Sequence, residues 1–522
     1  MSGERTPVEG RPLENLPTDP DYPAIPERAL GWLKYLHWKA NLADDWSKGG
    51  QPNEVWDNYS TPPTLSWHRF DLIDSCYALA ALAEITPAWR ELYVTIFDQL
   101  LQRYSAYWAA IDWLEQIGHD PDRAKYPISW RGVLVPEAHW GRYDAPGWTA
   151  NGVEPWGLQL DPIGANGNLF YKGWFDLMLG LRRSIGGDDR WNEAFEVVGD
   201  GENTFTYTHR QVNEVLEGQW GNRPEGVHCE NTKIWPFCLS AAALGLQLHD
   251  LHYQSESHWV FDQWWQVMEQ RYTVRNREGR PSKVALYYDP LVDELLWAAP
   301  TANLGLAFYL APQRREMAEQ LFRGIADQAG WSDADRPVQN DPDPHFIPLG
   351  IALAREFGDG ELAERLQSFA DDELEPTWDE AQRFSYGFGL GERFPRGQPN
   401  GIMALAQLLP GEQGWSNLFR VADRSRFEQP TVCNVNFPDL GISQAYFDPH
   451  RQTLAVSTYG PTTEATKRTS FTIAGVPKAE SWRVVRDGRA YSEVRVIERD
   501  RLEIGTDTAS HNFLIETGKE DR

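Results

Sequence analysis

Two cysteines stand nine residues apart in the segment V-H-C-E-N-T-K-I-W-P-F-C, at Cys229 and Cys238. If one straight helix carried both, steps of about 100° would put the thiols on opposite faces, about 13 Å apart along the axis. Pro236 indicates another arrangement, because proline is favoured at the first position of a helix. Cys229 then lies in the preceding loop and Cys238 in the first turn, where the helix dipole favours a thiolate.

Two such thiols suit acid/base or nucleophilic chemistry if the loop folds back so that both sulfurs meet one pocket. The alternative is that both are ordinary buried, small apolar residues. Two histidines extend the candidate set: His228 precedes Cys229, and His68 stands at the start of an expected helix. Either ring could exchange a proton, although a structural histidine held by hydrogen bonds explains the same pattern.

The segment from Asp161 to Leu181 carries an aromatic stripe. Phe170, Trp174 and Met178 recur at every fourth position, as on one face of a helix. Gly173 in the middle of that helix costs about 1 kcal/mol relative to alanine, which indicates a close neighbour or a ligand. The stripe therefore fits either a binding wall or the helical core.

Taken together, these two segments resemble the linalool dehydratase/isomerase family. The residues that carry the resemblance are Asp161–Ile163, Tyr171–Gly173, Leu177–Gly180, Cys229 with Glu230, and Cys238. A later segment, Leu353–Asp359, is also similar to the family. The resemblance covers roughly residues 30 to 410.

The resemblance implies a homo-oligomer of (α/α)6 barrels, with an active site near a subunit interface that a loop of the adjacent subunit completes. It also implies a cofactor-free hydro-lyase/isomerase that removes water from, or adds it to, a tertiary or allylic isoprenoid-type alcohol. Because hydroxide is a poor leaving group, an acid must protonate it as the C–O bond breaks, and a base must take a neighbouring C–H proton. Cys229 and Cys238 are transferred as the catalytic pair, and Phe170 and Trp235 as apolar substrate contacts.

The chain departs from the family pattern at two places. Trp174 stands where the family motif has a histidine, and His68 and His228 are our candidates to replace it. The loop that crosses between subunits maps loosely to residues 39–49, where Asp45 is the candidate carboxylate. The further candidates for substrate contact are Tyr171, Trp174, Trp46 and Thr301. These departures predict a different, bulkier isoprenoid or alkenol as substrate.

Paired carboxylates keep a second function open, a carbohydrate-active (α/α)-barrel enzyme acting as glycoside hydrolase or lyase. The pairs are Asp71 with Asp74, Asp289 with Asp293 and Glu294, and Asp341 with Asp343. Solvated loop charges also explain them. A third possibility is a non-catalytic relative that binds a ligand. The run from Asp341 to His345 is too sparse for a metal site, and no phosphate-binding loop indicates a nucleotide, so we expect neither metal nor cofactor.

The elements that must position these residues fall into two parts. From Ile25 to about Gln407, apolar residues recur at helical spacing. After about Arg420, short β-rich runs are broken by turn pairs such as Asp487–Gly488. We therefore expect a mainly α protein with a flexible arm over residues 1–24, an (α/α)6 barrel over 25–420, and a small antiparallel β-sandwich over 421–522.

Composition limits the partners. The 522 residues include 49 Lys and Arg against 76 Asp and Glu, a net charge of −27 that is spread along the chain and disfavours nucleic acids and anionic membranes. The 24 Trp, 20 Tyr and 22 Phe suit an aromatic-lined site for a small apolar alcohol or alkene. Few cysteines, no apolar run of about 20 residues and no apolar leader predict a cytoplasmic protein.

Overall fold

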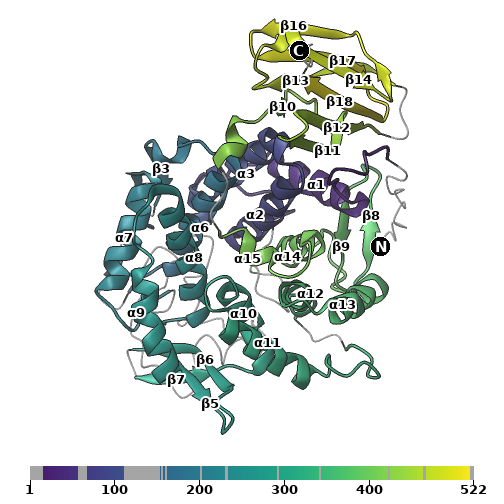
Figure 1. Cartoon of the computed structure of the whole chain (residues 1–522). Helices are drawn as coiled ribbons and strands as arrows, with labels where there is room; N and C mark the ends of the chain where they lie inside the picture. The colour runs from purple at the N-terminus through teal and green to yellow at the C-terminus, as the bar shows by residue number, and fades with distance from the viewer. Residues whose placement is uncertain are drawn as a thin grey trace, which may run out of the picture.

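The computed structural model describes residues 16–56, 68–110, 153–154, 157–158, 161–199, 203–229, 233–290, 293–339, 343–420, 424–461 and 466–517. Over these ranges, the expected combination of helices with antiparallel sheets is confirmed. Figure 1 shows the helices gathered in one body, with the C-terminal strands layered at one end of it. Of the helices in these ranges, none combines the length and the apolar character that crossing a membrane requires.

Six of the described helices form a closed cycle in which each contacts the next and the last contacts the first. In order they are α2 (His68–Ile85), α6 (Leu169–Gly186), α8 (Pro236–Tyr253), α10 (Leu304–Leu310), α12 (Phe346–Glu356) and α14 (Gly397–Leu408). Most side chains of α2 and α8 are buried around the whole circumference, as expected for helices that have neighbours on every side.

Six longer helices lie outside this cycle, and each contacts at least one of its members. They are α1 (Glu27–Ala40), α3 (Arg90–Tyr104), α7 (His209–Gly221), α9 (Trp259–Val267), α11 (Arg315–Ala329) and α13 (Gly360–Glu373). In α11, the buried residues Met317, Leu321 and Ile325 recur at helical spacing on one face. Short helices are α4 (Tyr107–Ala110), α15 (Gly414–Asn417), η1 (Pro87–Trp89), η4 (Arg190–Asn192), η7 (Met268–Tyr272), η8 (Pro300–Asn303), η9 (Arg424–Glu428) and η10 (Ala479–Ser481).

Small antiparallel hairpins interrupt the helical part, and the sequence pattern did not predict them. Their strands are β1 (Val153–Glu154), β2 (Gly157–Leu158), β3 (Phe195–Val198), β4 (Thr204–Tyr207), β5 (Thr273–Arg275), β6 (Pro281–Asp289), β7 (Glu294–Trp297), β8 (Pro376–Trp378) and β9 (Phe384–Tyr386). The strand β6 matters for the site. Its Tyr288 exchanges two backbone hydrogen bonds of 2.9 Å with Ile234, just before α8.

Two antiparallel sheets follow the helices, as expected from the β-rich runs. One has the order β10-β13-β17-β16 and the other β11-β12-β18-β14-β15. Phe471 and Phe513, one from each sheet, lie 5.3 Å apart, so the sheets share a core. The strands are β10 (Thr431–Cys433), β11 (Gly441–Asp448), β12 (Thr453–Tyr459), β13 (Arg468–Ala474), β14 (Trp482–Arg486), β15 (Arg489–Ala490), β16 (Val494–Glu498), β17 (Arg501–Asp507) and β18 (His511–Thr517).

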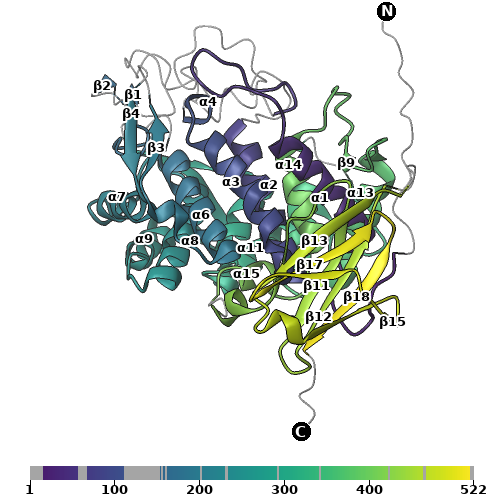
Figure 2. The same ribbon diagram turned by 90° about the horizontal axis from the view of Figure 1, so that it is seen from above.

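The sheets contact the helical part at η1, and Figure 2 shows them from above beside α1. Phe437 packs edge-on against His37 of α1, and Ile25 donates its backbone N–H to Ser443 at 2.7 Å. Residues 1–15 of the expected arm lie outside the described ranges. Its later part is held in place, because the Gln444 side chain donates to the carbonyls of Asp19 and Tyr22.

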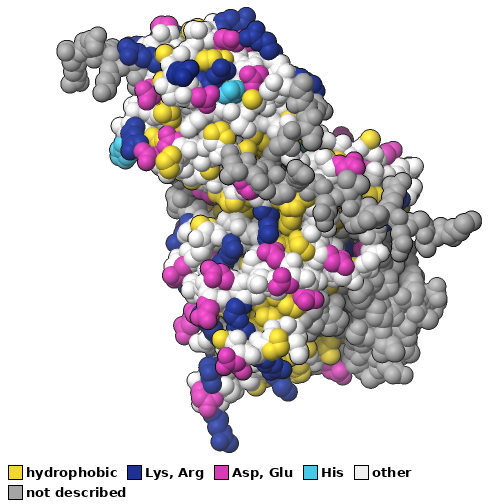
Figure 3. Space-filling model, turned by 90° about the vertical axis from the view of Figure 1, so that its right-hand side faces the viewer, with side chains coloured by type: hydrophobic (Ala, Val, Ile, Leu, Met, Phe, Trp, Pro, Cys, Tyr) yellow, Lys and Arg dark blue, Asp and Glu magenta, His cyan; other side chains and the backbone are white. Residues whose placement is uncertain are grey.

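Exposed charges are mixed on the face that Figure 3 shows, where acidic and basic side chains are interspersed over sheets and helices. Surface ion pairs such as Arg393 with Glu54, at 2.9 Å, join some of them. Such exposed pairs contribute at most about 1 kcal/mol each, so the fold depends on its apolar core.

Helices α6 and α8 approach each other more closely than ordinary side chains would permit. A Cβ added at Gly173 would lie 2.6 Å from the Cβ of Ala242, and one at Gly180 would lie 2.7 Å from the Cβ of Leu248. In return, a Cβ at Gly245 would lie 2.8 Å from the backbone of Leu177. The close neighbour predicted for Gly173 is therefore α8.

We expect Gly173→Ala to lower the free energy of unfolding by about 1–3 kcal/mol, because the added methyl group meets the rigid Ala242. Gly218→Ala is the matched control: Gly218 lies in α7 with nothing within 4 Å of the added Cβ. Its better helix propensity should stabilise the protein by up to about 1 kcal/mol. Thermal and urea unfolding of both variants check this, and equal stabilities would contradict the close-packing account.

Candidate functional site

The cysteine segment adopts the arrangement that Pro236 predicts. Helix α8 begins at Pro236 with Trp235 as its N-cap residue, so Cys238 lies in the first turn and Cys229 in the loop before it. The loop closes on itself, because the backbone N–H of Cys229 donates to the carbonyl of Lys233 at 2.8 Å. Residues 230–232 between them lie outside the described ranges.

Contacts with α8 and α6 hold this loop. A Cβ added at Gly226, whose φ is +115°, would lie 2.5 Å from Leu239, so the loop folds back on the first turn of α8. The carbonyl of His228 accepts the backbone N–H of Leu169 at the start of α6, at 3.2 Å. Cys229 and Cys238 are only 3% and 5% exposed. The thiols are thus fixed where α6 and α8 begin.

An aromatic wall extends along the same ends of the inner helices. The Phe170 ring lies 4.1 Å from Phe70 and 4.2 Å from Trp174, and Trp174 lies 5.5 Å from Phe237, the residue before Cys238. Phe70 and Phe237 are half-buried, whereas Trp174 is fully buried. Aromatic faces of this kind suit apolar ligands and can stabilise developing positive charge.

A second aromatic contact follows the N-cap of α8. Trp235 is half-buried and lies 4.9 Å from Tyr287 of β6. Thr301 is half-buried in η8, directly before the start of α10. A Cβ added at Gly305, in the first turn of α10, would lie 2.6 Å from the Phe237 ring. Trp235 and Thr301, both expected to contact substrate, therefore lie on elements that meet the start of α8.

Buried hydroxyl groups lie next to the rings of this aromatic wall. The hydroxyl groups of Tyr77 and Tyr309 are 2.8 Å apart, and the indole N–H of Trp174 donates to Tyr309 at 3.4 Å. Burial raises the pKa of both phenols well above the ordinary value, and the charge of Asp74 raises the pKa of each further. Both phenols therefore keep their protons at neutral pH.

The candidates from the loop over residues 39–49, which the family resemblance predicts to cross between subunits, lie at the other end of the wall. Trp46 packs edge-on against His68, with ring centroids 5.5 Å apart, so the structure brings these two together at the start of α2. Asp44 anchors the loop by accepting the indole N–H groups of Trp46 and Trp56. Asp45 is exposed and accepts the backbone N–H of Ser47 at 2.9 Å, so it points away from this group.

Two residues that the sequence suggested for the site, His228 and Tyr171, bond to neighbouring elements instead of lining the aromatic wall. His228 accepts a hydrogen bond from Arg223 at 2.6 Å, and burial together with the nearby cations lowers its pKa to about 3. The ring is therefore uncharged at neutral pH and cannot serve as an imidazolium acid. Tyr171 donates its hydroxyl to the carbonyl of Tyr104 at 2.8 Å and stacks on that ring, so it faces α3. Neither geometry turns the side chain toward the aromatic wall.

The carboxylates considered for glycoside chemistry have structural partners. Asp71 forms a buried ion pair with Lys39, and Asp289 pairs with Lys233 at 3.2 Å. Asp293 is exposed beside Arg271. In the last expected pair, Asp343 bonds His345 and Asp341 lies outside the described ranges. Within those ranges, no group of three or more His, Cys, Asp or Glu could hold a metal ion.

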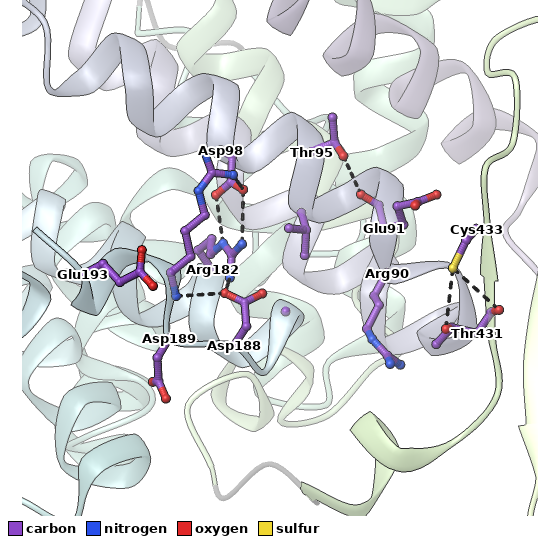
Figure 4. Close-up of a pocket in the computed structure, with 13 residues that line it drawn as sticks. Arg90, Glu91, Thr95, Asp98, Arg182, Asp188, Asp189, Glu193, Thr431 and Cys433 are labelled. Carbon is purple, nitrogen blue, oxygen red and sulfur yellow. Dashed lines mark hydrogen bonds and ion pairs between the residues drawn. The ribbon is translucent and has the colours of Figure 1, made fainter. Parts of the chain in front are cut away.

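A separate charged cleft of about 640 Å³ lies between α3, the C-terminal end of α6 and β10 (Figure 4). Its charges pair with one another: Arg182 bonds Asp98 at 2.9 Å and Asp188 at 2.5 Å, and Arg190 bonds Asp98 at 2.7 Å. Arg182 is about 18 Å along α6 from Phe170, since each helical residue adds about 1.5 Å. The cleft is therefore distinct from the cysteine site.

Comparison with known proteins supports the resemblance. The family model described as "Linalool dehydratase/isomerase" matches residues 137–386, which include both cysteines, Phe170, Trp174 and Tyr309. The chain is thus similar to that family as a distant relative. Among curated proteins, none matches the chain.

Two solved structures are similar at low scores. Endoglucanase CelQ from Clostridium thermocellum complexed with cellotriose has 10% identity and a TM-score of 0.33, over 94% of this chain and 93% of that chain. A GH127 β-arabinofuranosidase has 8% identity and a TM-score of 0.23, over 94% and 74%. At these scores neither structure supports an assignment of fold or function.

Three histidines make stability depend on pH: His228 and His249 are buried, and His252 is half-buried. Burial lowers the pKa of His228 and His252 to about 3 and that of His249 to about 4. These rings stay neutral in the folded protein but bind protons in the unfolded chain below about pH 6.5, so stability present at pH 7 is lost as the pH falls. Each contributes up to about 1.4 kcal/mol per pH unit.

We therefore expect the melting temperature to fall between pH 6.5 and 4.5, and to fall less steeply for His228→Gln than for the wild type. His450→Gln is the control, because His450 is exposed. Scanning calorimetry across this range measures both slopes. A wild-type slope in His228→Gln would show that this ring is already protonated in the folded protein.

Proposed function

We propose that this protein is a cofactor-independent hydro-lyase/isomerase that removes or adds water on a tertiary or allylic isoprenoid-type alcohol. The family match supports a linalool dehydratase/isomerase-like function at the level of the family. The observation that carries the proposal is the pair of buried cysteines, Cys229 and Cys238, held at the start of α8 beside an aromatic wall.

The chemistry requires an acid for the leaving hydroxyl and a base for a neighbouring C–H. Cys238 lies in the first turn of α8, where the helix dipole stabilises a thiolate. The rings of Phe170, Trp174 and Phe237 offer an apolar, electron-rich surface to an allylic cation. We assign the acid/base work to the two cysteines and substrate contact to these rings with Trp235 and Thr301.

We also propose the finer architecture. The closed cycle of inner helices, each flanked by outer helices, supports an (α/α)6 barrel over residues 25–420. The two facing sheets support a β-sandwich over residues 421–522, and residues 1–24 would form the arm.

We further propose a homo-oligomer with the site near a subunit interface. The exposed Asp45, on a loop whose Trp46 is buried beside His68, is then available to a neighbouring subunit. Thiol chemistry needs reduced cysteines, and none of the four cysteines forms a disulfide in the structure. A reducing compartment, the cytoplasm, suits such a protein.

We expect Cys229→Ala and Cys238→Ala each to lower turnover by at least about 10²-fold, the usual contribution of a positioned acid or base. Products formed from linalool, geraniol, nerolidol and smaller tertiary alkenols, measured by gas chromatography under reducing anaerobic conditions, check this. Cys433→Ala is the matched control, because Cys433 lies on β10.

The control should retain wild-type turnover and all three variants should keep the wild-type circular dichroism. Wild-type rates in a folded Cys229→Ala or Cys238→Ala protein would remove the cysteines from the mechanism. Absence of product from every alcohol, in the wild type, would overturn the hydro-lyase assignment.

A further inference from the structure

The buried hydroxyl groups next to the aromatic wall converge on one point, which packing alone does not require. Tyr77 comes from α2, Tyr309 from α10 and Trp174 from α6, and their polar atoms converge although the surrounding core is apolar. Burying polar groups costs free energy unless they are hydrogen-bonded, so apolar residues of similar size would be the cheaper filling. Such buried clusters in a site are candidates for function.

The oxygen of Tyr309 lies at the centre of this cluster. It is 2.8 Å from the Tyr77 hydroxyl and 3.4 Å from the Trp174 indole nitrogen. When both neighbours donate to this oxygen, the proton of Tyr309 itself is left to be donated elsewhere. Two converging donors also form the arrangement that stabilises a negative oxygen in a water-poor site.

Tyr309 also lies against two rings of the proposed substrate surface. Its ring is 5.3 Å from Phe237 and 5.7 Å from Trp174. The charges of Asp74 and Cys238 both act on its hydroxyl, which places it within electrostatic reach of the cysteine at the start of α8. Four inner helices thus supply one connected group.

We propose that Tyr309 is a further catalytic residue, the proton donor to the leaving hydroxyl of the substrate, with Tyr77 and Trp174 as its positioning residues. The inference rests on the proposed hydro-lyase function and deepens it: the acid is then Tyr309 and the base Cys238, in place of an acid and a base that are both cysteines. It also removes the need for a histidine at the position of Trp174, because the indole N–H positions the acid instead of being one.

The step balances without a cofactor. The Tyr309 proton passes to the hydroxyl oxygen as the C–O bond breaks and the bonding pair leaves with water. The Cys238 thiolate takes a C–H proton from the neighbouring carbon, and that electron pair forms the C=C bond. A thiol is the stronger acid than a phenol, so the proton then returns from Cys238 to the Tyr309 phenolate. The enzyme ends in its starting state.

Burial suits this role because it keeps the Tyr309 phenol protonated. The raised pKa of Tyr309 means that the phenol is protonated across the range in which the enzyme would be assayed. The hydrogen bonds from Tyr77 and Trp174 act in the opposite direction and favour the phenolate, which is the form present after the proton has left.

Tyr309→Phe tests the proposal by removing only the hydroxyl. With the alcohol that the wild type converts fastest, we expect kcat to fall by about 10²–10⁴-fold with little change in KM, since the variant keeps the phenyl ring that packs against Phe237 and Trp174. Tyr77→Phe should lower kcat by about tenfold, because it removes one of two hydrogen bonds to the developing phenolate.

Tyr93→Phe is the matched control, because Tyr93 is an equally buried phenol in α3 that bonds Thr86, the residue after α2. It should retain wild-type kcat. Circular dichroism and melting temperature establish whether each variant is folded. If Tyr309→Phe does not fold, the kcat of Tyr77→Phe tests the proposal instead.

The outcomes separate this inference from the proposed function. If the cysteine variants are inactive while Tyr309→Phe keeps wild-type kcat, the hydro-lyase survives and the role of Tyr309 is overturned. Equal losses in Tyr309→Phe and Tyr93→Phe would also overturn it, since a general packing defect would then explain both. If the wild type converts no alcohol, both proposals fall together.

Discussion

Helices α6 and α8 approach each other so closely that a methyl group on Gly173 would lie 2.6 Å from Ala242. This contact decides where the candidate site lies. It brings the ring of Trp174, one residue after Gly173, within 5.5 Å of the ring of Phe237, which precedes Cys238 in the first turn of α8. The loop that carries Cys229 is then fastened to the start of both helices. A larger residue at Gly173 would separate the aromatic wall from the thiols.

Local signals were sufficient for much of the fold. Helical periodicity predicted most of the longer helices, and alternating β-rich runs predicted the strands from β12 onward. Pro236 predicted the start of α8, because its fixed φ and missing N–H suit the first helical position. Gly173 predicted a close neighbour because a helix-interior glycine has a cost that some contact must offset. The hairpins such as β5–β6 were missed, since they are short and lie among helices.

Long-range partners were beyond the sequence pattern. Tyr77 and Tyr309 are 232 residues apart, and neither has a local motif that marks it. Asp71 and Asp289 were read as possible acid or base groups because their partners Lys39 and Lys233 are not sequence neighbours. His228 was a candidate for its place beside Cys229, whereas burial near cations holds it neutral. These outcomes depend on which helices meet, which periodicity alone does not specify.

The central claim is that buried cysteines at the start of α8 drive cleavage of a C–O bond without a cofactor. Oxygen-isotope exchange measures this cleavage: the alcohol that the wild type converts fastest is incubated with the protein in ¹⁸O-labelled water, and the recovered alcohol is analysed by mass spectrometry. We expect the alcohol to gain ¹⁸O with the wild type and not with Cys238→Ala, because reversible loss of water exchanges the oxygen even when little alkene accumulates. Retention of the original oxygen, or equal exchange in both proteins, would contradict it.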